Sequence, residues 1–354
     1  MLIPFLGKNP ETADRIIEEL SNYPSLQMAH LLQSLLENPW DKKVRKTIRR
    51  SLYRMKSRGI TVEEVLPDRE GPVFRPIQAE PARGFGGPYD FLGQRFLMLA
   101  IPHMGRGLNV LQGIISDIEG LVDCSSGEMA RKGFKLFFEE VQKGSPFPLI
   151  EMEPSYVGFL FDQAYHLTVA IGKTPPQDFL HLRGEIARIK KEYERPLIYS
   201  HFQENEIEGD DLSLRRGSDL IKIDLFNSWK LREEEIRTYA NQVWEAEESK
   251  LFLNQAQKEA RFQEIYQKAL SELFTEEKRL IYQKRMEEMA YYLLKTKREE
   301  EARISLAVAI DLKKAPNRIQ PNPFLFQLVV KSIFTFLSEA YEKKRNEFSL
   351  IAKP

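Results

Sequence analysis

The residues best suited to chemistry form one dense basic cluster near the N-terminus. Residues 41–58, DKKVRKTIRRSLYRMKSR, hold nine of the chain's 52 lysines and arginines and a single acid, Asp41. This leaves 43 basic residues against 51 acids in the rest of a chain that is formally neutral. Lysine and arginine neutralise phosphate groups, and a local patch can do so on a neutral protein. The cluster therefore indicates an anion-binding site.

On a helix, this cluster separates into two sides. The buried side is predicted by five residues that fall within about 100° of arc at 3.6 residues per turn: Val44, Ile48, Ser51, Leu52 and Met55. The opposite side carries the candidate binding residues Lys42, Arg45, Lys46, Arg49, Arg50, Tyr53 and Lys56. An exposed tyrosine among cations can stack on a base, which favours a nucleic-acid strand or a phosphorylated ligand. The alternative is a solvated face whose charges pair with acidic helices farther along the chain.

A second group of chemically capable residues lies near the ends of expected strands. It consists of His103, Asp117, Glu119 and Asp123, with Cys124 beside them. If the strands pair as a hairpin, alternation sets Asp117 and Glu119 on one face, where two carboxylates can bind a metal or transfer protons. Acids at strand ends are also common turn residues. An acid/base or metal-dependent enzyme is therefore the least favoured alternative.

Composition and missing motifs exclude several classes of protein. One cysteine excludes an internal disulfide and every multi-cysteine metal site, and it fits a reducing cytoplasm. No HExxH, GxSxG or Walker pattern occurs, so we expect no metal, no cofactor and a non-enzymatic role. No apolar run approaches the ~18 residues of a membrane span, and no secretory signal pattern opens the chain. We therefore expect a cytoplasmic protein with no membrane partner.

The first two blocks of the chain differ in pattern. Residues 10–66 carry apolar side chains at helical spacing, with Asp41 as a helix cap and Gly59 as a helix stop. Residues 67–93 are rich in proline and glycine, which predicts a connector. Beyond it, three apolar runs bounded by glycine or proline predict strands: Arg95–Ile101, Leu108–Ile115 and Gly120–Asp123.

Helices are expected in the rest of the chain. Ser125–Glu128 should lead into one helix, and Ser155–Ile171 should form another. From Leu231 to Leu312 charged and apolar residues alternate at spacings of three and four without a proline, which predicts several long helices. A final helix is expected over Leu325–Glu347.

Two segments resemble helical repeats. The segment LLQSLLENPWDKKVRKTIRRSLYRM, within residues 30–58, resembles a HEAT-type repeat in its paired leucines, its Asn38-Pro39 turn and its Val44-Arg45 pair. The segment MAYYLLKTKREEEARISLAVAIDL, within residues 286–312, is similar to a tetratricopeptide helix pair, with Ala302 and Ala309 at small positions. These resemblances imply α-hairpin arrays, and arrays of this kind usually hold partner proteins.

The chain is therefore predicted to be α+β and predominantly α, with helical hairpin arrays flanking a small strand-containing unit. The predicted parts are a HEAT-like block (1–66), a connector (67–93), an α+β domain (94–205), a linker (206–225) and a C-terminal helical array (226–354). The first functional hypothesis is a non-enzymatic scaffold that engages a partner protein through its helical arrays. The alternative is RNA or DNA binding through residues 41–58.

Overall fold

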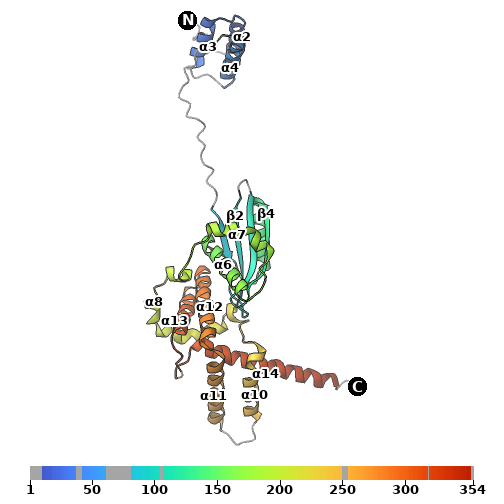
Figure 1. Ribbon diagram of the computed structural model, residues 1–354, viewed down its shortest axis with the longest axis vertical. Coiled ribbons are helices and arrows are strands. Elements are labelled where there is room, and N and C mark those ends of the chain that lie inside the picture. The colour runs from blue at the N-terminus through green and yellow to red at the C-terminus, as the bar shows by residue number, and fades with distance from the viewer. Residues whose placement is uncertain are drawn as a thin grey trace. The chain divides into compact units, whose positions relative to one another are not determined.

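The protein divides into two compact units, Met1–Gln78 and Ala79–Pro354. The computed structural model describes residues 10–36, 42–60, 81–103, 107–248, 254–317 and 319–351. Within these ranges the protein is predominantly α in the α+β class, as predicted (Figure 1). Asp41, the predicted helix cap, lies outside the described residues.

The described part of the first unit consists of the helices α2 (Pro10–Ser21), α3 (Leu26–Leu36) and α4 (Lys42–Lys56). Their apolar faces share one small core, to which α4 contributes Val44, Ile48 and Met55. Gly59 adopts a φ of +85° directly after α4, a conformation that glycine reaches without a Cβ penalty. The predicted buried stripe and the predicted stop of this helix are both confirmed.

The second unit contains an antiparallel sheet with both faces covered. Its described strands are β1 (Arg83–Gly86), β2 (Gln94–Pro102), β3 (Gly107–Ser116), β4 (Gly120–Ala130) and β5 (Ile150–Met152), in the order β4-β3-β2-β1-β5. Alternation along β2 directs Leu97 and Leu99 into one core and Met98 and Ala100 into another. The first core is shared with α6 (Pro154–Ala170) and α7 (Gln177–Ile189), and the second with α5 (Arg131–Gly144). Figure 1 shows α6 and α7 over one face of the sheet.

The predicted β-hairpin is confirmed, but two neighbouring predictions are wrong. Residues 83–86, assigned to the connector, form β1, because Gly84 lets α6 lie directly on the strand. A Cβ at Gly84 would stand 2.7 Å from Val157 Cγ2. Ser125–Glu128, expected to lead into a helix, instead belong to β4, where Ser126 pairs with Leu111. The following helix, α5, begins only at Arg131.

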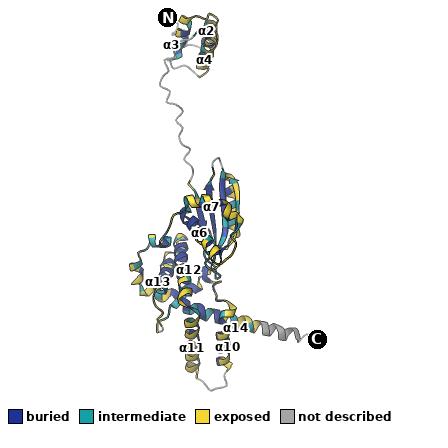
Figure 2. Cartoon of the chain, viewed as in Figure 1, coloured by how far each residue is buried: buried dark blue, intermediate teal, exposed yellow. Residues whose placement is uncertain are grey.

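Long helices fill the rest of the second unit, as predicted. They are α10 (Glu233–Glu248), α11 (Gln255–Leu273), α12 (Glu276–Lys295), α13 (Glu299–Lys313) and α14 (Pro323–Ile351). Their buried side chains belong to the same core as one face of the sheet (Figure 2). Trp229 Nε1, for example, donates to the carbonyl oxygen of Tyr89 at 3.3 Å. The sheet and the C-terminal helices therefore share one hydrophobic interior.

The predicted linker 206–225 is structured. It holds α8 (Glu204–Glu208), α9 (Asp211–Arg215) and the 3₁₀ segments Arg216–Lys222 and Asp224–Phe226, which follow an earlier 3₁₀ turn, η1 (Leu197–Ser200). Ile207, Leu220 and Leu225 from this segment are buried. The segment contributes to the core and does not act as a linker.

One helix of the described chain, in contrast to our expectation, is long and apolar enough to cross a membrane by length and composition. It is the Pro323–Glu342 part of α14, and 33% of its apolar window is buried inside the protein. Phe324, Leu325 and Leu328 belong to the core. Packing in the second unit thus accounts for part of the apolar character of α14.

Candidate functional site

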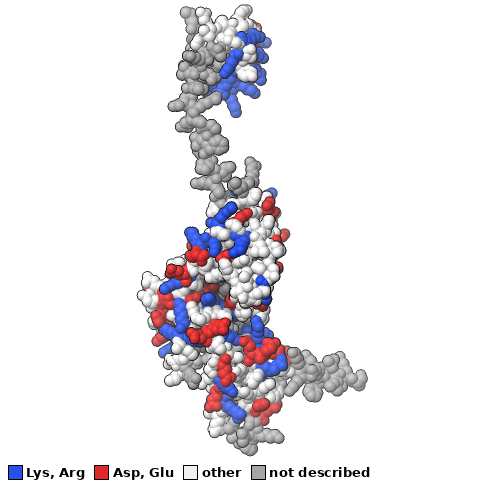
Figure 3. All heavy atoms as spheres, in the orientation of Figure 1, with Lys and Arg blue, Asp and Glu red and all other residues white. Residues whose placement is uncertain are grey.

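Helix α4 presents its cations on the exposed side of the first unit. All seven predicted binding residues are exposed, and so are Lys43, Arg54 and Arg58. Figure 3 shows the lysines and arginines gathered on one side of this unit. Tyr53 lies near the middle of the basic arc and is 73% exposed. The predicted binding residues are thus brought together on one surface.

Most of these cations have no ion-pair partner among the described residues: Arg45, Lys46, Arg49, Arg50, Arg54, Lys56 and Arg58. The first turn of α4 contains no acid, whereas its last turn holds Arg54 and Lys56, which the negative end of the helix dipole favours. Like charges repeat four residues apart, as in Lys46 and Arg50, which costs an isolated helix about 0.2–0.5 kcal/mol per pair. The helix thus carries an electrostatic cost that a bound polyanion would relieve.

The alternative interpretation of α4 requires acidic helices with unused charge. Many acids on the helices of the second unit already pair with cations of that same unit. Lys278 contacts Glu235 at 2.5 Å, and Arg237 contacts Glu233 at 2.8 Å. Local pairing of this kind reduces the negative charge that the second unit has available for α4.

The central candidates do not form one site. Asp117 and Glu119 lie in the turn between β3 and β4 and bind different cations: Asp117 binds Arg285, and Glu119 binds Lys173. The turn that holds Asp117 lies beside the start of β2, because Gln94 pairs with Ser116. His103 follows the other end of β2, where Pro102 pairs with Leu108. Asp123 is an exposed residue of β4. Asp117 and Glu119 are therefore turn residues that bind separate cations, and they do not form a carboxylate pair.

The surroundings of Asp117 and Cys124 argue against chemistry at this end of the sheet. Arg285 binds Asp117 through two nitrogens, at 2.5 and 2.8 Å, while burial raises the pKa of this carboxyl above its ordinary value. Burial, with a smaller contribution from Asp123, raises the pKa of Cys124 to about 12. A thiol with this pKa is protonated near neutral pH and is a poor nucleophile. Among the described residues no group of three or more His, Cys, Asp or Glu side chains could hold a metal ion.

Sequence reasoning missed a buried polar network on α12. Glu288 accepts from Arg95 at 2.6 Å and also from the hydroxyl of Tyr156. Glu287 accepts from the hydroxyl of Tyr199 at 2.6 Å. Both glutamates are at most 5% exposed. The sequence does contain a signal for this network, because two adjacent acids interrupt the otherwise apolar run that begins at Met286. Acids inside such a run are expected to be buried, and buried acids require hydrogen-bonding partners.

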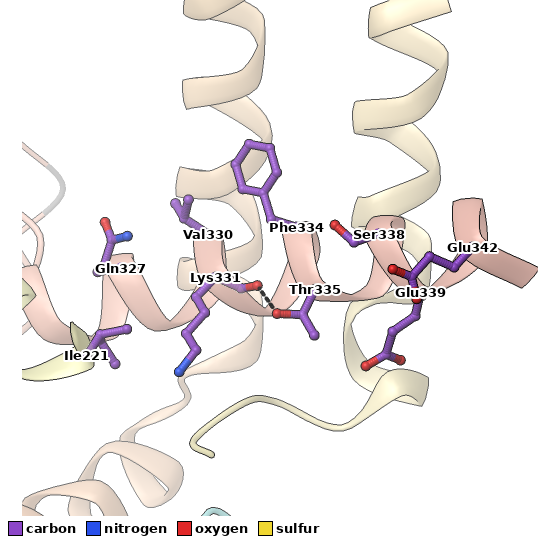
Figure 4. A pocket seen from close by; sticks show the side chains of 9 residues that line it. All are labelled: Ile221, Gln327, Val330, Lys331, Phe334, Thr335, Ser338, Glu339 and Glu342. Atoms are coloured by element: carbon purple, nitrogen blue, oxygen red, sulfur yellow. Dashed lines mark hydrogen bonds between the residues drawn. The ribbon is translucent and has the colours of Figure 1, made fainter. Parts of the chain in front are cut away.

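A shallow groove runs along α14 (Figure 4). It has a volume of about 570 Å³ and combines apolar Val330 and Phe334 with polar Lys331, Ser338 and Glu339. Phe334 is 53% exposed. An aromatic side chain exposed beside polar groups is typical of a contact surface for another protein.

Comparisons with protein-family models, with curated proteins and with solved structures found no match for this chain.

Proposed function

We propose that this protein binds a single nucleic-acid strand through the exposed basic face of α4. The observation that carries the proposal is the set of exposed cations on that helix without ion-pair partners among the described residues. Cations of this kind release counterions from a phosphate backbone when they bind it, and this release supplies most of the affinity for a strand.

Tyr53 supports a single strand as the ligand. Its ring is exposed in the middle of the cations, and an aromatic ring stacks on unpaired bases regardless of their sequence. Base stacking on one aromatic residue contributes about 1–3 kcal/mol. A folded duplex presents few unstacked bases to such a ring, so we expect weaker binding to a duplex than to a strand.

The test is a charge reversal on the full-length protein. Arg45, Arg49 and Arg50 are changed together to glutamate, and the affinity for a fluorescent 20-nucleotide RNA is measured by anisotropy. We expect at least a hundredfold loss of affinity. The fold should survive, because Arg50→Glu places a carboxylate four residues from both Lys46 and Arg54, where opposite charges attract.

A matched control carries the same change in net charge on another exposed helix. Lys132, Lys135 and Lys143 lie exposed on α5, and their joint change to glutamate should leave RNA affinity nearly unaltered. If the α5 variant loses as much affinity as the α4 variant, the attraction is a property of overall charge and the assignment to α4 fails.

The C-terminal helices support a second candidate function, the binding of a partner protein. The exposed ring of Phe334 beside the groove on α14 favours it. We expect a protein that co-purifies with the wild type to be lost from the Phe334→Asp variant and retained by Leu212→Asp, a change at another exposed apolar residue. If both variants retain the co-purifying protein equally, the groove on α14 is not its binding surface.

The wider proposal is a non-enzymatic binding protein of the cytoplasm. The pair α3–α4 forms the helix hairpin to which the HEAT-type resemblance applies, and α12–α13 forms the pair with the tetratricopeptide resemblance. Both resemblances are consistent with binding surfaces made of helices, and a single thiol is consistent with a reducing compartment.

A further inference from the structure

A cleft opens in the second unit where α6, η1 and α12 meet. Its volume is about 820 Å³, which lies within the range of roughly 300–1,000 Å³ that holds small ligands. Its wall contains Tyr89, Tyr156, Phe159 and Tyr193, and the carboxylate of Glu287 also faces it. This site lies in the second unit and does not depend on binding by α4.

The acids of the cleft wall that are not exposed have cations beside them. Asp117 is paired with Arg285 and Glu288 with Arg95. Lys313 lies 3.7 Å from Oε1 of Glu287 and also binds Glu204 at 2.6 Å, and Glu204 is paired in turn with Arg195. Four cations (Arg95, Arg195, Arg285 and Lys313) stand beside four carboxylates (Asp117, Glu204, Glu287 and Glu288), so neither a cation nor an anion would gain a net electrostatic attraction here. The charge balance favours an uncharged ligand.

Among the polar atoms of the cleft wall that have no hydrogen-bond partner in the described residues, two belong to buried residues. The first is the hydroxyl of Tyr89, a residue that is 9% exposed and whose ring lies 5.1 Å from the guanidinium of Arg95. The second is Oε2 of Glu287, because Tyr199 and Gln283 both donate to Oε1. Both atoms keep hydrogen-bonding capacity that a ligand in the cleft can use. The cleft therefore offers a ligand one hydroxyl and one carboxylate oxygen.

Aromatic rings form the apolar part of the cleft wall. The ring centroid of Tyr193 lies 4.8 Å from that of Tyr156 and 5.4 Å from that of Phe159. Pockets that bind small molecules combine such aromatic surface with a few fixed polar groups. A hydroxyl group donates one hydrogen bond and accepts two, so it can bind a carboxylate oxygen and a tyrosine hydroxyl at once.

We propose that this cleft binds a sugar ring, held by stacking on the aromatic wall and by hydrogen bonds from its hydroxyl groups to Glu287 and Tyr89. A sugar is uncharged, is rich in hydroxyl groups and has an apolar face of C–H bonds. It matches the neutral charge balance, the two unsatisfied polar atoms and the aromatic wall together.

The test uses the full-length protein and ligand-observed NMR with D-glucose, D-galactose and N-acetyl-D-glucosamine. We expect saturation transfer to the ring protons of at least one of these sugars. Tyr89→Phe should weaken its binding about three- to tenfold, because one hydrogen bond is lost. This variant should fold normally, since the Tyr89 hydroxyl bonds to no described residue.

Tyr341→Phe is the matched control, because Tyr341 is exposed on α14 outside the cleft, and it should bind the sugar as the wild type does. Tetramethylammonium and inorganic phosphate serve as charged probes and should not bind. The proposal is overturned if none of the three sugars shows transfer, if Tyr89→Phe binds sugar as tightly as the wild type, or if only a charged probe binds.

Discussion

Individual charges in the second unit are held by partners from distant parts of the chain. Arg95 comes from β2 and is fully buried, and its partner Glu288 comes from α12, 193 residues later. Transfer of either charge from water costs several kcal/mol, so loss of one partner would leave the other buried and uncompensated. Such a pair fixes how α12 meets the sheet.

Asp210 gives a residue-scale prediction for pH. Its carboxylate binds Arg303 at 2.5 Å and also accepts from Ser213 at the start of α9, and these bonds lower its pKa to about 2. The carboxyl is therefore more acidic in the folded state than in the unfolded state. It contributes stability above the ordinary aspartate pKa and loses this contribution as the pH falls toward 2.

The corresponding variant is Asp210→Asn. Its free energy of unfolding at pH 7 should be lower than that of the wild type by about 1 kcal/mol, a value reduced for the partial exposure of Arg303. Urea unfolding at pH 7, 4 and 3 checks this, and the difference should shrink between pH 4 and pH 3. A difference that grows toward low pH would contradict the assignment.

The candidate residues could be predicted only where the signal was local. The apolar stripe of α4 fixes its exposed side, and this pattern is contained in fifteen consecutive residues. Glu287 and Tyr89 were not found, because their significance depends on neighbours 88 or more residues away in the chain. Asp117 was singled out, but its partner Arg285 follows 168 residues later.

Among the elements, the hairpin of α12 and α13 contains an unusual turn. Lys297 adopts a φ of +64°, a left-handed conformation that favours glycine, and no other non-glycine residue of the described chain has a positive φ. The N–H of Lys297 donates to the carbonyl of Leu294, and that of Arg298 donates to Leu293, so the turn closes the end of α12. A left-handed conformation costs an L-residue about 1–2 kcal/mol.

Lys297→Gly should therefore stabilise the protein by about 1 kcal/mol. The matched control is Lys268→Gly on the exposed side of α11, which should destabilise it by about 1 kcal/mol because glycine is unfavourable inside a helix. Thermal unfolding of both variants measures the two shifts. Destabilisation by Lys297→Gly would show that the lysine side chain, and not its backbone, matters in this turn.

Elements with strong periodicity were predicted well, and those defined by packing were not. Strands β2 and β3 are long apolar runs between glycine and proline, and α6 has a full apolar helical pattern. Strand β1 is four residues long and contains two glycines. It exists because α6 and β5 lie against it, and no local pattern carries that information.

At the scale of the whole molecule, the two units have separate cores and the second unit has no internal boundary at residue 226. The sheet and the C-terminal helices share buried residues, and the hydroxyl of Tyr292 donates to the carbonyl of Pro148 at 2.7 Å. The fragment 79–354 should therefore unfold cooperatively, with protected amides in β2.

The fragment 79–225 lacks α10–α14 and should not fold, because the buried Arg95 would lose its partner Glu288 and the part of the core shared with those helices would be exposed to water. Hydrogen exchange of both fragments, read on the peptides of β2, measures this difference. Equal protection of β2 in the two fragments would mean that the sheet unit folds independently, as the domain prediction of 94–205 assumed.

The central claim, that α4 binds a nucleic-acid strand, is tested most directly by the salt dependence of RNA binding. With four to six phosphate contacts, the logarithm of the association constant should fall with the logarithm of salt concentration with a slope of roughly −3 to −4. Replacing Arg45, Arg49 and Arg50 with alanine should make this slope shallower by about 2, whereas alanine at Lys132, Lys135 and Lys143 should leave it unchanged. An equal slope in the wild type and the α4 variant would contradict the account.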